Sequence, residues 1–132
     1  MKHITILISF LLLLLFFTVN NTQANQQKAL YEAVVNGDIE QVKSEIEAGF
    51  DVNTKYKMDW TLLHAAIYTK HADIALLLIE KGADVNIRTT DGATALWMAS
   101  TYGHMDVVKL LLEQAERQDL ARLAEPLPAQ VE

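Results

Sequence analysis

The sequence predicts an all-α repeat protein, an α-solenoid of about three stacked helix–turn–helix units with β-hairpin-like loops, preceded by a signal peptide. Three observations predict it: an internal period of 33 residues, apolar stripes at helical spacing within each period, and a strongly apolar N-terminal segment. The chain has 132 residues, 17 acidic against 11 Lys and Arg side chains, and no cysteine. Its length corresponds to one domain with a modest core.

The N-terminal segment has the three parts of a secretory signal. Lys2 precedes an apolar run over 4–17, and a short polar stretch then leads to Thr22-Gln23-Ala24. The run is shorter than the roughly 20 apolar residues that span a membrane comfortably. We expect residues 1–24 to be a signal peptide cleaved after Ala24, and export to a bacterial periplasm, with secretion as the alternative. The membrane is then met only transiently, whereas an uncleaved signal would tether the protein to it.

The 33-residue period recurs in several separate features of the chain. Asp51-Val52-Asn53 returns at 84–86, Gly49 returns as Gly82, and the segment 61–66 has its counterpart at 94–99. Self-similarity of this length indicates a stacked repeat array. We expect a repeat domain over 25–125, with units at about 26–58, 59–91 and 92–124, and a flexible C-terminal tail over 126–132.

Each unit has the sequence signals of two short helices and a turn. Thr61 suits the N-cap of a helix that runs to about Thr69, and Thr94 repeats this role toward Thr101. A second helix is expected over about 73–81, where apolar residues follow an i, i+3, i+4 pattern and Gly82 ends the helix. Asp91-Gly92 then favours a tight turn between short extended arms.

These segments carry a family resemblance. Gly-Ala-Asp-Val-Asn at 82–86, Asp-Gly-Ala-Thr-Ala-Leu at 91–96 and Thr-Leu-Leu-His-Ala-Ala at 61–66 resemble the motifs of ankyrin repeats. The resemblance covers roughly 26–119. It implies a stacked helical fold that binds proteins, a His64 that steadies neighbouring hairpins, and histidines at 71 and 104 that cap the second helices.

The sequence departs from the family motifs at a few positions. Leu62 and Ala95 replace the family's proline, Asp59 replaces its turn glycine in the second unit, and Trp97 replaces its histidine in the third. Because Trp97 occupies a position that is structural in the family, we expect it to be mainly structural as well.

The two ends of the array have the features of caps. Glu45 stands where the second unit has Leu78, which suits a face that no repeat precedes. In the third unit Ala115 replaces Gly82, so no further hairpin begins there. We expect the last helix to continue over the final core face through Leu120, Leu123 and Ala124. Three units are about the minimum for such a stack, so stability should be marginal.

Composition and motifs disfavour several classes of function. The acidic chain argues against nucleic acid as a partner, and the lack of cysteine excludes disulfides and thiolate chemistry. Ser44 and Ser100 lie in no nucleophile motif, and no glycine-rich phosphate loop occurs. Acidic residues that recur once per unit have a structural place in each. We therefore expect no enzymatic activity and no cofactor.

The remaining candidate is a protein-binding surface. The resemblance implies that the hairpin tips and the exposed side of the first helices contact the partner. These positions combine cations with aromatic residues, the types that dominate binding hot spots, and an acidic patch on a partner would complement them. The candidate residues are Lys55, Tyr56, Lys57, Met58, Trp60, Tyr68, Thr69, Arg88, Thr90, Asp91, Thr101 and Tyr102.

Other interpretations remain open at this point. In the simplest one, Trp60 and Tyr68 pack against adjacent hairpins and the lysines only solvate the tips. The expected function is a monomeric protein–protein interaction module in the bacterial envelope. The first alternative is an immunity-type regulator or inhibitor of an exported enzyme or toxin. The second is a metal or small-ligand accessory protein that uses His64, His71 and His104.

Overall fold

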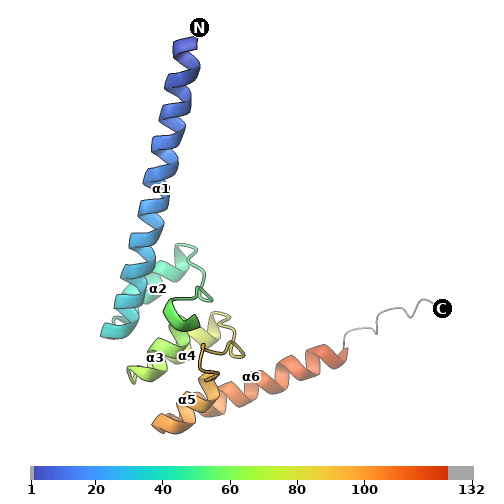
Figure 1. Ribbon diagram of the computed structural model, residues 1–132. Coiled ribbons are helices and arrows are strands. Elements are labelled where there is room, and N and C mark those ends of the chain that lie inside the picture. The colour runs from blue at the N-terminus through green and yellow to red at the C-terminus, as the bar shows by residue number, and fades with distance from the viewer. Residues whose placement is uncertain (1, 125–132) are drawn as a thin grey trace, which may run out of the picture.

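The computed structural model describes residues 2–124, apart from the side chains of residues 20, 21, 122 and 124. The expected tail over 126–132 lies outside this range. Within it the chain forms helices and turns without a β-strand, as predicted (Figure 1). The elements are α1 (Lys2–Asn36), α2 (Ile39–Glu47), the short turn η1 (Lys57–Asp59), α3 (Leu62–Tyr68), α4 (Ala72–Glu80), α5 (Ala95–Tyr102) and α6 (Met105–Ala124).

The helices form three consecutive pairs that stack in a row. α1 packs on α2, α3 on α4 and α5 on α6, while α1, α3 and α5 also line up as one layer (Figure 1). The two loops between pairs are hairpin-like, each closed by one antiparallel bridge, Lys55 with Thr61 and Arg88 with Thr94. This arrangement confirms the predicted solenoid of helix–turn–helix units.

The predicted helix boundaries are confirmed where capping residues defined them. The Thr61 hydroxyl accepts the N–H of His64 at the start of α3, and the Thr94 hydroxyl accepts the N–H of Trp97 at the start of α5. These bonds satisfy backbone donors that have no partner inside the helix. After α4, Gly82 adopts φ +93°, the left-handed conformation that ends a helix at low cost for glycine.

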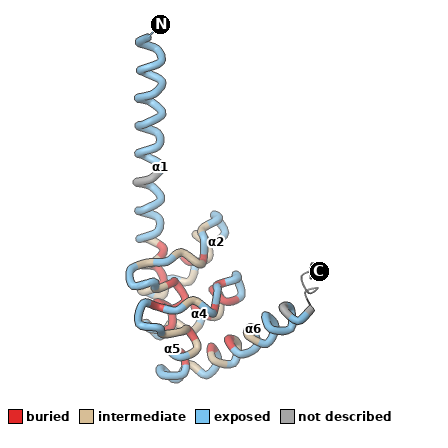
Figure 2. Tube along the Cα trace, turned by 45° about the vertical axis from the view of Figure 1, so that its right-hand side comes forward, coloured by how far each residue is buried: buried red, intermediate tan, exposed pale blue. Residues whose placement is uncertain are grey.

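The core lies between the two layers and runs through all three units (Figure 2). Leu62 and Ile67 from α3 are fully buried, together with Ile74 and Leu78 from α4. Burying each such side chain contributes about 1.5–3 kcal/mol. No unit encloses its own apolar residues, so this contribution exists only while neighbouring pairs stay stacked.

α1 joins the apolar N-terminal segment to the first helix of the array in one uninterrupted helix of 35 residues. The expected boundary after Ala24 therefore does not coincide with a helix end. The polar stretch around it contains no glycine or proline, so nothing interrupts the backbone hydrogen bonds. By length and composition α1 could cross a membrane, with a mean hydropathy of 2.2 over 18 residues.

α6 confirms one expectation about the C-terminal end and corrects another. Because Ala115 replaces the helix-ending glycine, the helix continues to Ala124. Leu120 and Leu123, however, are exposed and do not cover the last core face. The reason is geometric: α5 has only eight residues and α6 has 20, so the C-terminal half of α6 extends beyond the stack (Figure 1).

One histidine ties each of the second and third units to the unit before it. His71 occupies the N-cap position of α4 but makes no side-chain cap bond; its Nε2 instead bonds the carbonyl of Val35, 3.0 Å away. His104 likewise bonds the carbonyl of Ile67 at 3.2 Å. The expected capping role is thus replaced by a bond between units, which satisfies a carbonyl at the end of the preceding first helix.

Gly37 should be essential to this contact. A Cβ atom at Gly37 would lie 2.6 Å from Cε1 of His71, whereas one at Gly92, which has a similar positive φ, would meet nothing within 4 Å. Gly92→Ala should cost about 1–2 kcal/mol through backbone strain alone. Gly37→Ala should cost about 1–3 kcal/mol more, because the imidazole must move. Chemical denaturation measures both, and equal losses would contradict the role of His71.

Candidate functional site

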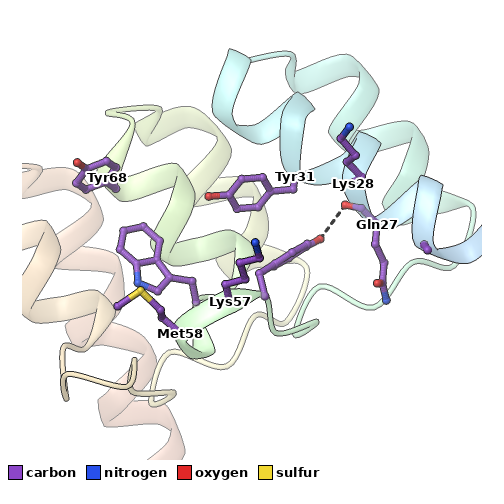
Figure 3. Close-up of a pocket in the computed structure, with 9 residues that line it drawn as sticks. Gln27, Lys28, Tyr31, Lys57, Met58 and Tyr68 are labelled. Carbon is purple, nitrogen blue, oxygen red and sulfur yellow. Dashed lines mark hydrogen bonds between the residues drawn. The ribbon is translucent and has the colours of Figure 1, made fainter.

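A hollow of about 640 Å³ opens between α1, the first hairpin and α3 (Figure 3). Tyr31 enters it from α1 and Tyr68 from the end of α3, while Met58 stands at the hairpin tip. We call it the aromatic groove. Its walls consist of Ala24, Gln27, Lys28, Tyr31, Tyr56, Lys57, Met58, Trp60 and Tyr68.

Aromatic rings form two contacting sets across the face of the first helices. Tyr31 and Tyr56 have ring centroids 4.8 Å apart. Trp60 contacts Tyr68 edge-to-face at 5.3 Å, and Tyr68 contacts Tyr102 in the same way at 5.8 Å. Such pairs are favourable and hold each ring in place, yet Tyr68 remains 54% exposed. The groove therefore offers ordered aromatic surface to solvent.

The hairpin tip at the groove has an unusual backbone. Met58 and Asp59 both adopt left-handed φ values, 62° and 57°, and Asp59 stands where the third unit has Gly92. For residues other than glycine this costs about 1–2 kcal/mol each. The carbonyl of Met58 accepts the N–H of Thr90 at 2.9 Å, so the second hairpin holds the first. This bond holds the backbone at Met58, whose exposed side chain lines the groove.

Two lysines flank the aromatic groove in different states. Lys28 forms an ion pair with Glu32 at 3.6 Å. Lys57 has no carboxylate within ion-pair distance among residues 2–124. Lys57 therefore contributes an uncompensated positive charge at the groove, although the whole chain has a net charge of −6.

Tyr56 links the hairpin to α1. Its hydroxyl donates to the carbonyl of Gln27 at 3.1 Å (Figure 3). Burial and, to a smaller extent, the neighbouring Tyr31 raise the pKa of Tyr56 to about 12. The phenol is thus neutral and remains a donor at any physiological pH, which keeps this wall of the groove attached.

The structure brings five of the predicted site residues together in the aromatic groove: Tyr56, Lys57, Met58, Trp60 and Tyr68. Tyr102 extends the row of rings through its contact with Tyr68. Trp60 is half-buried and packs against Tyr68 rather than standing alone. The simpler packing interpretation thus holds for part of its surface, while the exposed ring of Tyr68 stays available.

The other predicted residues lie outside the groove. Lys55 pairs with Asp59 at 3.9 Å. The hydroxyls of Thr69 and Thr101 donate to carbonyls of their own helices, both at 2.8 Å. Arg88 and Thr90 are exposed on the second hairpin, and Asp91 borders a separate hollow of about 370 Å³ with Gly92, Ala93 and Trp97.

Sequence reasoning missed the wall that α1 provides, formed by Ala24, Gln27, Lys28 and Tyr31. The period itself contained the signal. Gln27 lies 33 residues before Trp60, and Tyr31 lies 33 before His64. Because a stack repeats its geometry at each period, the first unit presents the same positions to the same face.

Trp97 corrects an expectation. His64, one period earlier, is only 1% exposed, whereas Trp97 is 59% exposed. His64 accepts the Thr61 N–H on Nδ1 at 3.2 Å and faces the backbone of the second hairpin. Within residues 2–124 no hairpin follows the third unit, so nothing covers the indole of Trp97.

The environment of His64 disfavours its charged form. Burial lowers the pKa of His64 below its usual value, and the carbonyl groups of Ile87 and Ala93 oppose this effect. Among the described residues Nε2 has no acceptor in good hydrogen-bonding geometry, so these two carbonyls only partly offset the cost of burial. In that range no group of three His, Asp or Glu side chains is placed to hold a metal ion.

The chain matches known proteins by sequence. A family model described as ankyrin repeats (3 copies) matches residues 6–89 and 30–122. The Notch-regulated ankyrin repeat-containing protein of Xenopus tropicalis is 38% identical over 62 residues, and that of Homo sapiens 37%; each alignment covers 47% of this chain and 54% of the relative. Ankyrin repeat domain-containing protein 40 of Mus musculus is 39% identical over 57 residues, which are 42% of this chain and 16% of that protein. The chain thus spans about half the length of the first of these relatives.

The lowered pKa of His64 predicts a pH-dependent stability. Between the folded and unfolded pKa values the unfolded chain binds more protons, so the free energy of unfolding should decrease as the pH falls below about 6.5. Denaturation at about pH 7.5 and pH 5 measures the decrease. His64→Gln should remove this pH-dependent decrease. His71→Gln should lower the free energy of unfolding at both pH values but leave the pH-dependent decrease in place. A decrease that persists in His64→Gln would contradict the assignment.

Proposed function

Because the chain belongs to the ankyrin repeat family, whose members are generally non-enzymatic protein–protein interaction modules, we propose that it binds another protein through the aromatic groove and the adjoining hairpin tips. The observation that carries this proposal is the row of ordered, partly exposed rings beside Lys57, which has no ion-pair partner within residues 2–124. Rings that are already fixed lose little conformational entropy on binding, so more of the free energy from their buried contact area contributes to affinity.

The charge at the groove indicates the chemistry of the partner. Lys57 and the exposed Arg88 lie on successive hairpins, on a chain that is acidic as a whole. An apolar or aromatic side chain of the partner would fill the groove, and an acidic patch beside it would face these cations. Such complementarity raises the association rate and excludes partners with the wrong charge.

A regulatory role is the second candidate function. A regulator or inhibitor of an exported enzyme or toxin would use the same surface and differ only in the consequence of binding. An activity assay of the captured partner, with and without this protein, separates it from a passive scaffold. A metal-dependent accessory function has less support, because the three histidines bond separate partners: His64 bonds Thr61, His71 bonds Val35 and His104 bonds Ile67.

The proposed location is outside the cytoplasm, with the bacterial periplasm as the first choice and secretion as the alternative. The support is the basic start, the apolar run and the small residues around Ala24. The relatives compared above come from vertebrates, so this assignment rests on the leader alone. Cleavage after Ala24 would leave Gln27, Lys28 and Tyr31 in the groove wall.

Removal of the groove rings should abolish binding without unfolding the protein. Once the partner has been captured from an envelope fraction and purified, calorimetry measures its affinity for each variant. Tyr68→Ala should weaken binding at least about tenfold, since exposed aromatic anchors dominate such interfaces, and Trp60→Ala/Tyr68→Ala should abolish it. The matched control is Trp97→Ala, an equally exposed ring outside the groove, which should bind normally.

Thermal unfolding of the same variants provides the second readout. If Trp60→Ala/Tyr68→Ala unfolds at room temperature, its rings belong to the core, and Tyr68→Ala alone then decides the proposal. Normal affinity in a folded Tyr68→Ala protein, or an equal loss in Trp97→Ala, would remove the groove as the binding site.

Export makes a separate prediction about covalent structure. The protein isolated from its host should begin at Asn25, and its intact mass should correspond to residues 25–132. Replacing Ala24 with a bulky residue, as in Ala24→Phe, should block processing and keep the protein in the membrane fraction. A full-length mass for the unaltered protein would contradict cleavage and indicate a tethered form.

A further inference from the structure

The C-terminal end of the stack is apolar where the end of an array is usually polar. Ile79 is only 4% exposed because the third unit covers it, while Leu112, its counterpart one period later, is 50% exposed. Trp97 and Met105 are exposed at the same end. Terminal repeats generally carry polar outer faces for solubility, so this end has the composition of an interface.

The exposed side of α6 carries a second, independent pattern. Six residues follow one another at alternating intervals of four and three, which places them on one stripe along the helix. We call this stripe the α6 seam. All six are exposed, while Val107 and Leu111 on the opposite side of the helix are buried in the core. The α6 seam consists of Met105, Lys109, Leu112, Glu116, Asp119 and Leu123.

The α6 seam is complementary to itself in one orientation only. When two copies of α6 run antiparallel, with residue 114 of each at the centre, Met105 faces Leu123 of the other copy, Lys109 faces Asp119, and Leu112 faces the stem of Glu116. In a parallel pair Lys109, Glu116 and Asp119 would each face their own like charge, which is repulsive. The charge sequence therefore selects an antiparallel second copy.

Head-to-tail stacking of a second copy fits less well. In such stacking, the first unit of one copy would lie on the third unit of another and act as a fourth repeat. Within one chain, His71 ties the second unit to the first, and His104 ties the third unit to the second. The first unit has Asp38 at this position, and its carboxylate accepts the N–H of Gln41. A carboxylate cannot donate to the carbonyl that the histidine would reach.

We propose that the α6 seam is a self-association interface through which two copies of this chain form an antiparallel, two-fold symmetric dimer. This differs from the monomer expected from sequence. The dimer is independent of the aromatic groove, which lies on α1, the first hairpin and α3. It would present two grooves and so favour partners that display their binding segment twice.

Charge reversal tests the interface directly. The full-length protein is studied in a detergent that is density-matched to the solvent, so that sedimentation equilibrium reports protein mass alone. Lys109→Glu and Asp119→Lys should each raise the dimer dissociation constant about tenfold or more, because each places like charges opposite one another. The combination Lys109→Glu/Asp119→Lys should restore dimerisation. Lys81→Glu makes the same charge change outside the seam and should have no effect.

Three outcomes would overturn the proposal. The first is a monomeric mass at about 100 μM protein. That result would rule out a second copy as the occupant of the seam, whatever else covers it. The second is a dimer that Lys109→Glu leaves unchanged, which would place association elsewhere, for example on α1. The third is failure of the double variant to recover although its circular dichroism and thermal unfolding match those of the unaltered protein.

Discussion

Stacking between neighbouring units is the constraint on which every other part of this structure depends. No helix pair encloses its own apolar residues, so Leu62, Ile67 and Leu78 are buried only because units precede and follow them. The bonds from His71 to Val35 and from His104 to Ile67 add directional contacts to this non-directional burial. They fix how far each pair is rotated and shifted along the array.

The aromatic groove is a product of that alignment. Its walls come from the first unit, from the loop between units and from the first helix of the second unit, so no single unit contains the site. The Met58 carbonyl accepts the N–H of Thr90 in the next loop, and the Tyr56 hydroxyl donates to the Gln27 carbonyl in α1. A change that loosens stacking would therefore also alter the groove.

Much of the fold could be predicted from sequence, because its signals are local or periodic. Thr61, Thr94 and Gly82 mark helix ends through bonds or backbone angles that involve only a few neighbouring residues. The misjudged positions depend on what lies beyond them. Trp97 and Leu120 are exposed because nothing in the described chain covers them. The part that α1 plays in the groove depends on a contact between residues far apart in the sequence, Tyr31 in α1 and Tyr56 in the first hairpin.

Because α1 is uninterrupted, the proposed cleavage after Ala24 would act directly on the groove. Ala24 is part of its wall, and Gln27 and Lys28 follow within one turn. Where the chain is cut after Ala24, a new terminal ammonium group appears at Asn25, beside a wall that has lost one side chain. Such a cut would remove one side chain from the mouth of the groove and would add a positive charge near it. An acidic ligand would then bind the processed chain more tightly than the precursor. The proposed cleavage would therefore determine when the ligand binds this protein.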